Sequence, residues 1–216
     1  MMSIFENTKN LIDEVNSMSN DVLIVAASKM RTVDEIEECK RGGIEVFAEN
    51  RVQEFVDKVD LTDVKWHFVG QLQTNKVKYL VGRVELIHSV DSEKLADEIS
   101  KIARKKNVTQ EILIEINIGG EETKGGVSEA NFDNLYLHCQ NLPNVKVVGI
   151  MSVMPKSAST KLYLRIKEIY DKIRIENKDI KYLSVGMSGD YQRAIEYGAN
   201  VIRIGTKIFG ARRQKE

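Results

Sequence analysis

Lys29 is the residue of this sequence whose type and position could support covalent chemistry. It ends the stretch VLIVAASK, in which small and apolar residues run from Val22 to Ser28. A lysine amine that is partly removed from water holds its proton less tightly, and the free amine attacks an aldehyde or ketone to form a Schiff base. A lysine that only ends a buried strand has the same local sequence. Its sequence neighbours therefore leave both roles open.

Two segments in the C-terminal part of the chain combine glycine with hydroxyl side chains, as phosphate-binding loops do. The first, VGMSGD, contains Ser188, and the second, RIGTKIFG, contains Gly205 and Thr206. Glycine lets backbone N–H groups come close to phosphate oxygens, and hydroxyl groups donate further hydrogen bonds. Tight turns alone would also require glycine. Two such loops in succession nevertheless favour a phosphate site.

Arg203 interrupts the apolar segment VIRIG, two residues before Gly205. Because side chains alternate along a strand, the two residues face the same side, which we expect to be the mouth of the site. A buried arginine needs an acceptor. That acceptor is either a bound ligand or an internal carboxylate, for instance Glu49 or Glu115, and the sequence favours neither.

Eight short apolar runs must position these residues. They are rich in Val and Ile and mostly continuous, which is typical of strands buried on both faces of a parallel sheet. The runs span 22–28, 45–50, 66–70, 86–90, 111–118, 145–152, 182–186 and 201–205. Amphipathic helical segments lie between several of them, at 32–43, 89–107, 128–144, 162–177 and 188–200. The alternation predicts one (β/α)8 barrel domain over 1–216; a doubly wound sheet is the alternative, but no strand is followed by GxGxxG or a P-loop.

In such a barrel all strands end at one face, where the functional residues gather. Lys29 follows the first strand, and the two Gly/Ser/Thr loops follow the seventh and eighth. The loops after these last two strands often hold phosphate in barrels of this type. The combination indicates a Schiff base with a phosphorylated aldehyde or ketone. Two chemistries fit: a pyridoxal phosphate site and an aldolase acting on a sugar phosphate.

The composition excludes several classes of protein. Lys and Arg together number 32, as do Asp and Glu, so the chain lacks the net positive charge of a nucleic-acid or membrane-surface binder. The ending ARRQKE could form a basic patch, but only a local one. Cys39 and Cys139 have the spacing of neither a zinc site nor a disulfide framework, and we expect free, buried thiols. No signal peptide or membrane-spanning run is recognisable, which predicts a cytoplasmic protein. His67 and His88 are expected in the core.

The sequence resembles the pyridoxal phosphate homeostasis proteins, the YggS/PROSC family. The resemblance rests on blocks that follow one another in order along nearly the whole chain. They are VAASK (25–29), FAENRVQE (47–54), WHFVGQLQTNK (66–76), IHSVDS (87–92), INIGGEETKGG (116–126), GIMSVMP (149–155), LSVGMSGDYQRAI (183–195) and VIRIGTKIFGAR (201–212). Two small departures are Ala48, where the family usually has glycine, and Met30, where threonine is usual. Neither removes a group that the chemistry requires.

The resemblance implies a barrel like the N-terminal domain of alanine racemase, with pyridoxal 5′-phosphate as the cofactor on Lys29. It further implies that Ser188, Gly205 and Thr206 contact the phosphate, that Arg203 faces the pyridine nitrogen and that Asn50 lines the cofactor pocket. It implies no metal.

The same resemblance favours a carrier over an enzyme. Racemases of this fold add a second domain and use a tyrosine as the second acid/base, whereas only four residues follow FGAR here. Tyr79 and Tyr191 are expected to be packing or surface groups. We therefore predict a monomeric, non-catalytic protein that stores, buffers or delivers pyridoxal phosphate, with apo forms of pyridoxal phosphate enzymes as possible partners. An amino-acid racemase is the alternative, and a Schiff-base aldolase is a more distant one.

Overall fold

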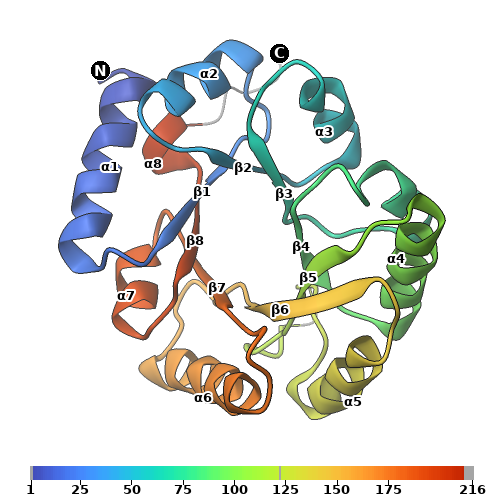
Figure 1. Cartoon of the computed structure of the whole chain (residues 1–216). Helices are drawn as coiled ribbons and strands as arrows, with labels where there is room; N and C mark the ends of the chain where they lie inside the picture. The colour runs from blue at the N-terminus through green and yellow to red at the C-terminus, as the bar shows by residue number, and fades with distance from the viewer. Residues whose placement is uncertain (1, 122, 212–216) are drawn as a thin grey trace.

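The chain folds into a closed barrel of eight parallel strands that neighbour one another in sequence order. A computed structural model describes residues 2–121 and 123–211. The strands form a ring, and the helices surround it (Figure 1). The strands are β1 (Leu23–Ala27), β2 (Val46–Glu49), β3 (Lys65–Phe68), β4 (Leu86–Val90), β5 (Gln110–Glu115), β6 (Val145–Met151), β7 (Tyr182–Met187) and β8 (Val201–Ile204). The predicted (β/α)8 barrel is confirmed, and each predicted apolar run overlaps one strand.

Helices follow or precede the strands on the outside of the ring. They are α1 (Ile4–Met18), α2 (Val33–Arg41), α3 (Val52–Val59), the 3₁₀ helix η1 (Thr74–Tyr79), α4 (Glu93–Lys106), α5 (Glu129–Gln140), α6 (Thr160–Glu176), α7 (Tyr191–Glu196) and α8 (Thr206–Phe209). The five predicted helices are present as α2, α4, α5, α6 and α7. Thr32 caps the N-terminus of α2 in a reciprocal capping box with Glu35.

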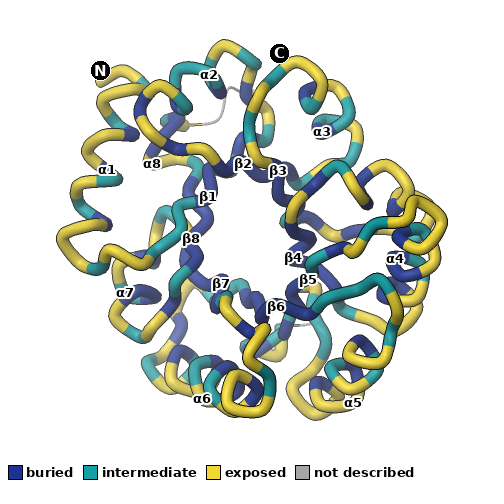
Figure 2. Tube along the Cα trace, in the orientation of Figure 1, coloured by how far each residue is buried: buried dark blue, intermediate teal, exposed yellow. Residues whose placement is uncertain are grey.

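The hydrophobic core has an outer and an inner part. The outer part joins strands to helices and contains residues such as Leu11, Phe55 and Ile99. Two inner clusters contain buried residues from strands only: Val25, Val46, Ala48 and Val201 in one, and Leu86, Leu113, Val148 and Met151 in the other. They fill the barrel, as expected for this fold. The strands are accordingly buried, while the outward faces of the helices are exposed (Figure 2).

The structure describes both cysteines and part of the basic ending of the chain. Cys39 and Cys139 are free and buried, as predicted, and burial raises their pKa values to about 11 and about 12. Among the described helices, none is long and apolar enough to cross a membrane. Of the basic ending ARRQKE, residues 212–216 lie outside the described ranges.

Gly149 occupies a bulge in β6 where the sheet leaves no room for a side chain. The register shifts there, because Ile112 pairs with Val147 but the next residue, Leu113, pairs with Gly149. Its φ is +157°, and a Cβ atom at this position would lie 1.9 Å from the carbonyl oxygen of Tyr182 on β7. Only glycine therefore permits this close pairing of β6 with β7.

We expect Gly149→Ala to lower the free energy of unfolding by at least about 3 kcal/mol, because the backbone of β7 would have to move. Gly120→Ala is the control. Gly120 also has a positive φ, +65°, but nothing lies within 4 Å of its Cβ position. It should cost only about 1–2 kcal/mol, the penalty for the left-handed backbone. Urea denaturation measures both; equal losses would contradict the steric explanation.

Candidate functional site

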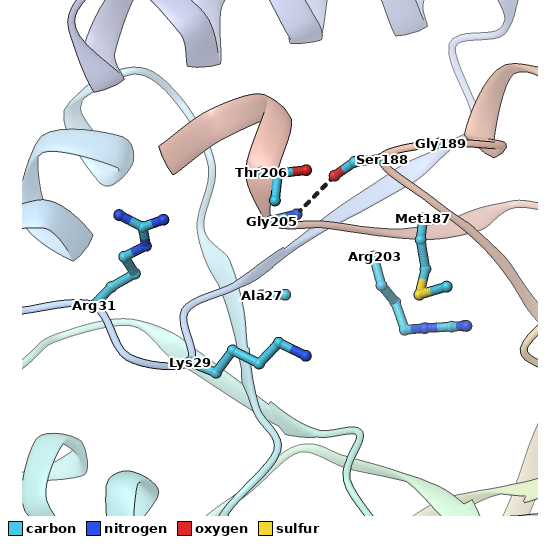
Figure 3. A pocket seen from close by; sticks show the side chains of 9 residues that line it. All are labelled: Ala27, Lys29, Arg31, Met187, Ser188, Gly189, Arg203, Gly205 and Thr206. Carbon is cyan, nitrogen blue, oxygen red and sulfur yellow. Dashed lines mark hydrogen bonds between the residues drawn. The ribbon is translucent and has the colours of Figure 1, made fainter. Parts of the chain in front are cut away.

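A cavity of about 200 Å³ opens where β1, β7 and β8 end. It is lined by Ala27, Lys29, Arg31, Met187, Ser188, Gly189, Arg203, Gly205 and Thr206. Figure 3 shows Lys29 on one side, the Ser188 and Gly205 loops on the opposite side, and Arg203 at the right-hand edge of the space between them. The structure thus brings together five of the six residues that the sequence analysis assigned to a cofactor site.

Pairing of the first strand with the last creates this arrangement. Val25 pairs with Arg203 and Ala26 with Ile204, so Ala27 and Gly205 are neighbours across the β1–β8 seam. A Cβ atom on Gly205 would lie 3.5 Å from the carbonyl oxygen of Ala27. The small residues at this seam keep the space between Lys29 and the second loop open.

The second Gly/Ser/Thr loop presents backbone hydrogen-bond donors that converge on a hydroxyl oxygen of the first loop. The Ser188 hydroxyl accepts hydrogen bonds from the backbone N–H groups of Gly205, at 3.2 Å, and Lys207, at 3.4 Å. Asp190 holds the first loop, because its carboxylate accepts a hydrogen bond from the N–H of Met187 at 2.7 Å. Backbone N–H groups that converge in this way form an anion site. The site therefore fits a phosphate group.

Gly186, the first glycine of VGMSGD, has a packing role. Its φ is +106°, and a Cβ atom here would lie 2.8 Å from that of Ala194 in α7. It lets α7 lie close to β7 and does not line the cavity. The following residues of the loop, Ser188 and Gly189, do line it.

Arg203 is buried and is held by oxygens of the two preceding strands. Its Nη1 donates to the carbonyl and the hydroxyl oxygen of Ser184, at 2.8 and 2.6 Å, and its Nη2 donates to the carbonyl of Ser152 at 3.0 Å. Burial lowers its pKa to about 10, while Glu115 opposes that shift, so the guanidinium stays charged at neutral pH. Of the two expected acidic partners, Glu49 is excluded because it pairs with Lys58. Glu115 acts on Arg203 only through its charge.

His67 and His88 extend the network of Arg203 through the barrel interior. His88 Nδ1 lies 3.1 Å from the Ser184 hydroxyl, and its Nε2 lies 3.0 Å from Nδ1 of His67. Burial lowers the pKa of His67 to about 3 and that of His88 well below its usual value. Both rings are therefore neutral, as expected for core histidines, and they orient the Ser184 hydroxyl that contacts Arg203.

A buried ion pair holds the backbone just before Lys29. Glu49 Oε1 accepts a hydrogen bond from the Ser28 hydroxyl at 2.8 Å and from Lys58 at 2.7 Å, and Lys58 also donates to the Ser28 carbonyl at 3.0 Å. Glu49 is fully buried. Burial raises the pKa of Glu49, although Lys58 beside it acts in the opposite direction. The pair anchors the end of β1 to β2 and α3.

The backbone just after Lys29 is held from the same helix. The N–H of Met30 donates to Glu54 at 2.6 Å, and Glu54 lies 3.6 Å from Lys58. Met30 has a φ of +60°, an uncommon value for a non-glycine residue, so this contact stabilises a strained turn. Sequence analysis missed this clamp, defined here as Glu49, Glu54 and Lys58. The available signal was a glutamate inside an apolar strand, followed by a Glu–Lys pair at helical spacing.

Asn50, which was expected in the cofactor pocket, and the two tyrosines that were expected to be packing or surface groups lie outside the Lys29 cavity. Asn50 follows β2 but lines a neighbouring cavity rather than that of Lys29. Tyr79 lines the same neighbouring cavity, and the Tyr191 hydroxyl donates to Glu14 on α1. In the described ranges no group of three His, Cys, Asp or Glu residues could hold a metal ion.

We expect Lys58→Met to lower the free energy of unfolding by about 3–5 kcal/mol, because Glu49 would remain buried without its counter-charge. The control is the double variant Glu49→Gln, Lys58→Met, which removes both charges and should recover much of that loss. Urea denaturation at pH 7.5 compares them. An equally large loss in the double variant would show that packing, and not charge, accounts for the effect.

Glu115 provides a pH-dependent test at the barrel mouth. Burial, and secondarily the charge of Asp91, raise its pKa to about 7 from an ordinary value of 4.5. The folded state therefore binds the proton more tightly than the unfolded state. This contribution to stability is complete below pH 4.5 and is lost as the pH rises through about 7. Relative to Glu115→Gln, the native protein should lose roughly 2–3 kcal/mol between pH 4.5 and 8. A pH-independent difference in urea denaturation would contradict this.

Comparison with known proteins identifies the family to which this chain belongs. The family model described as the alanine racemase N-terminal domain matches residues 3–213. A protein of Aquifex aeolicus named pyridoxal phosphate homeostasis protein is 44% identical, over 97% of this chain and 96% of its own length. A protein of the same name from Vibrio cholerae is 32% identical and covers 98% of both chains.

Solved structures agree with this result. PipY of Synechococcus elongatus, solved with PLP bound, has a TM-score of 0.82 at 28% identity, covering 94% of this chain and all of its own. Alanine racemase of Corynebacterium glutamicum has a TM-score of 0.79 at 13% identity, which shows a shared fold alone; this chain covers 61% of that enzyme. By the extent of these matches, the chain belongs to the family of pyridoxal phosphate homeostasis proteins, whose barrel is the alanine racemase N-terminal domain.

Proposed function

We propose that this protein binds pyridoxal 5′-phosphate in the Lys29 cavity and serves to store, buffer or deliver it. The observation that carries the proposal is the convergence of Lys29, the buried Arg203 and the donor loops of Ser188 and Gly205 on one cavity. The names of the Aquifex and Vibrio relatives and the PLP-bound structure of PipY support it. When bound, the cofactor would supply an aldehyde for a Schiff base and a ring that accepts electrons.

Each residue of the cavity would have a definite task. Lys29 would form the Schiff base, and its amine is positioned by the turn that the clamp holds. The backbone N–H of Gly205 and the hydroxyls of Ser188 and Thr206 would bind the phosphate, as charge-assisted hydrogen bonds. Arg203 would face the pyridine nitrogen. Because its charge is retained at neutral pH, it would disfavour a proton on that nitrogen and so weaken the ring as an electron sink.

The lining of the cavity supports holding the cofactor over catalysis. A two-base racemisation needs a second acid/base opposite the lysine. No tyrosine, histidine or carboxylate is among the described residues that line the cavity. Tyr191 is engaged by Glu14 and Lys207, and Tyr79 lies in the neighbouring cavity. We accordingly infer a non-enzymatic role. We further propose that the protein is a cytoplasmic monomer whose partners are apo forms of pyridoxal phosphate enzymes.

The proposal is tested by adding pyridoxal phosphate to the purified protein and recording the absorbance of a Schiff base. The band should appear with the native protein and be absent in Lys29→Ala, since no amine then faces the cavity. Lys156→Ala, which removes an exposed lysine elsewhere, should retain it. After borohydride reduction, mass spectrometry should place the added mass on Lys29. A native protein that takes up no cofactor would refute the proposal.

The carrier role has a separate test. Racemisation assays over the common amino acids should show no robust turnover by the cofactor-loaded protein, because the described residues that line the cavity include no second acid/base. Apo forms of pyridoxal phosphate enzymes should gain activity when mixed with it. Robust turnover of any amino acid would replace the carrier role with a racemase role while leaving cofactor binding intact.

A further inference from the structure

Two polar motifs that the proposed function does not use form the walls of a second cavity. Asn50, Arg51 and Gln53 follow β2, and Gln71, Gln73 and Lys76 follow β3. The cavity that these side chains line measures about 360 Å³. This volume is within the range of about 300–1,000 Å³ that is typical of small-molecule sites.

The two walls are locked together by the backbone. The N–H of Val69 donates to the carbonyl of Glu49 at 3.0 Å. A Cβ atom on Gly70 would lie 1.9 Å from the carbonyl oxygen of Asn50, so this contact requires glycine. These contacts fix the backbones of the loops after β2 and β3 relative to each other, while the side chains of Arg51 and Lys76 in the cavity lining are exposed.

The described residues that line this cavity carry a net positive charge. Arg51 and Lys76 line the cavity, and no carboxylate is among its described lining residues. Neither of the two forms an ion pair within the ranges that the structure describes, although the Lys76 amine lies 5.8 Å from the centre of the Tyr79 ring. The side-chain amide of Gln53 donates to Asp57 at 2.8 Å, which leaves its oxygen for another donor. Two cations and several amides suit an anion that also has polar groups.

The rest of the lining is apolar or aromatic. Val52 and Val56, both half-buried residues of α3, and the ring of Tyr79 complete the cavity. A bare inorganic ion would leave this surface in contact with water, whereas an organic body would cover it. The lining therefore favours an organic anion.

The second cavity lies beside that of Lys29. Ala27 pairs with Ala48, and Lys29 and Asn50 each follow two residues later, just beyond the ends of the adjacent strands β1 and β2. Neighbouring strands are about 4.8 Å apart. A ligand in the second cavity would thus be a neighbour of whatever Lys29 holds.

We propose that this second cavity binds a small organic anion, whose carboxylate or phosphate group contacts Arg51 and Lys76 and whose body lies against Val52, Val56 and Tyr79. The neighbouring amides of Gln71 and Gln73 would recognise its polar substituents. The proposal stands independently of the proposed function, because it needs no cofactor on Lys29.

The test is an NMR titration of the full-length protein, following the side-chain amide signals of Asn50, Gln53, Gln71 and Gln73. The probes are succinate and phosphoglycolate, which share a carboxylate and differ in the phosphate group. Saturable shifts of these signals are expected with at least one probe. The double variant Arg51→Ala, Lys76→Ala should bind roughly tenfold more weakly or worse, since charge-assisted hydrogen bonds are lost.

Lys78→Ala is the matched control, because Lys78 belongs to the same 3₁₀ helix and lies over the same Tyr79 ring but does not line the cavity. It should bind like the native protein. Shifts with both probes indicate a carboxylate site, and shifts with phosphoglycolate alone indicate a phosphate site. The proposal would be overturned if neither probe causes saturable shifts. It would also be overturned if Lys78→Ala weakens binding as much as the double variant does. The Schiff-base absorbance is measured separately, so failure of this site and failure of the cofactor site are distinguishable.

Discussion

Hydrogen bonding between β1 and β8 closes the barrel, and the candidate site depends on that closure. Leu23 to Ala26 pair in register with Val201 to Ile204 and join segments from opposite ends of the chain. Before closure, Lys29 and the phosphate-type loops have no fixed relation to each other. Such long-range parallel pairing carries a high entropic cost, which the strand residues that fill the barrel interior offset.

Three cations near the mouth of the barrel illustrate different solutions to burying charge. Lys58 has a carboxylate, Glu49, and a carbonyl oxygen within hydrogen-bonding distance. Arg203 has no ion-pair partner in the described ranges and relies on carbonyl and hydroxyl oxygens of β6 and β7. Lys29 lines an open cavity with donors across from it. An anionic ligand in this cavity would place acceptors opposite these donors.

The segment from Glu49 to Lys58 contributes residues to both cavities: some hold the turn around Lys29, and others line the second cavity. Glu54 and Lys58 are four residues apart and face the turn around Lys29. Arg51 and Gln53 face the second cavity instead. A short helix with two polar faces therefore lies between the two cavities.

The sequence by itself determined the barrel and most of the candidate site. Continuous Val- and Ile-rich runs that alternate with amphipathic segments specify buried parallel strands and covering helices, since both patterns are local. The topology then places every strand end on one face, so Lys29, Ser188, Arg203, Gly205 and Thr206 could be assigned to one site. Only tertiary structure decided the partners of the buried charges. Glu49 was a candidate partner of Arg203 by type, but its distance to Lys58 settled the pairing.

Asn50 is another residue whose surroundings only the tertiary structure decided. Its place at the end of β2 was predictable, whereas the cavity that it lines depends on how closely the loop after β3 approaches its carbonyl oxygen at Gly70. The side of a strand or helix that faces the core follows from periodicities of two and 3.6 residues. Contacts between loops and between buried charges depend on separations of a few ångströms between segments far apart in the chain, and no local pattern encodes those.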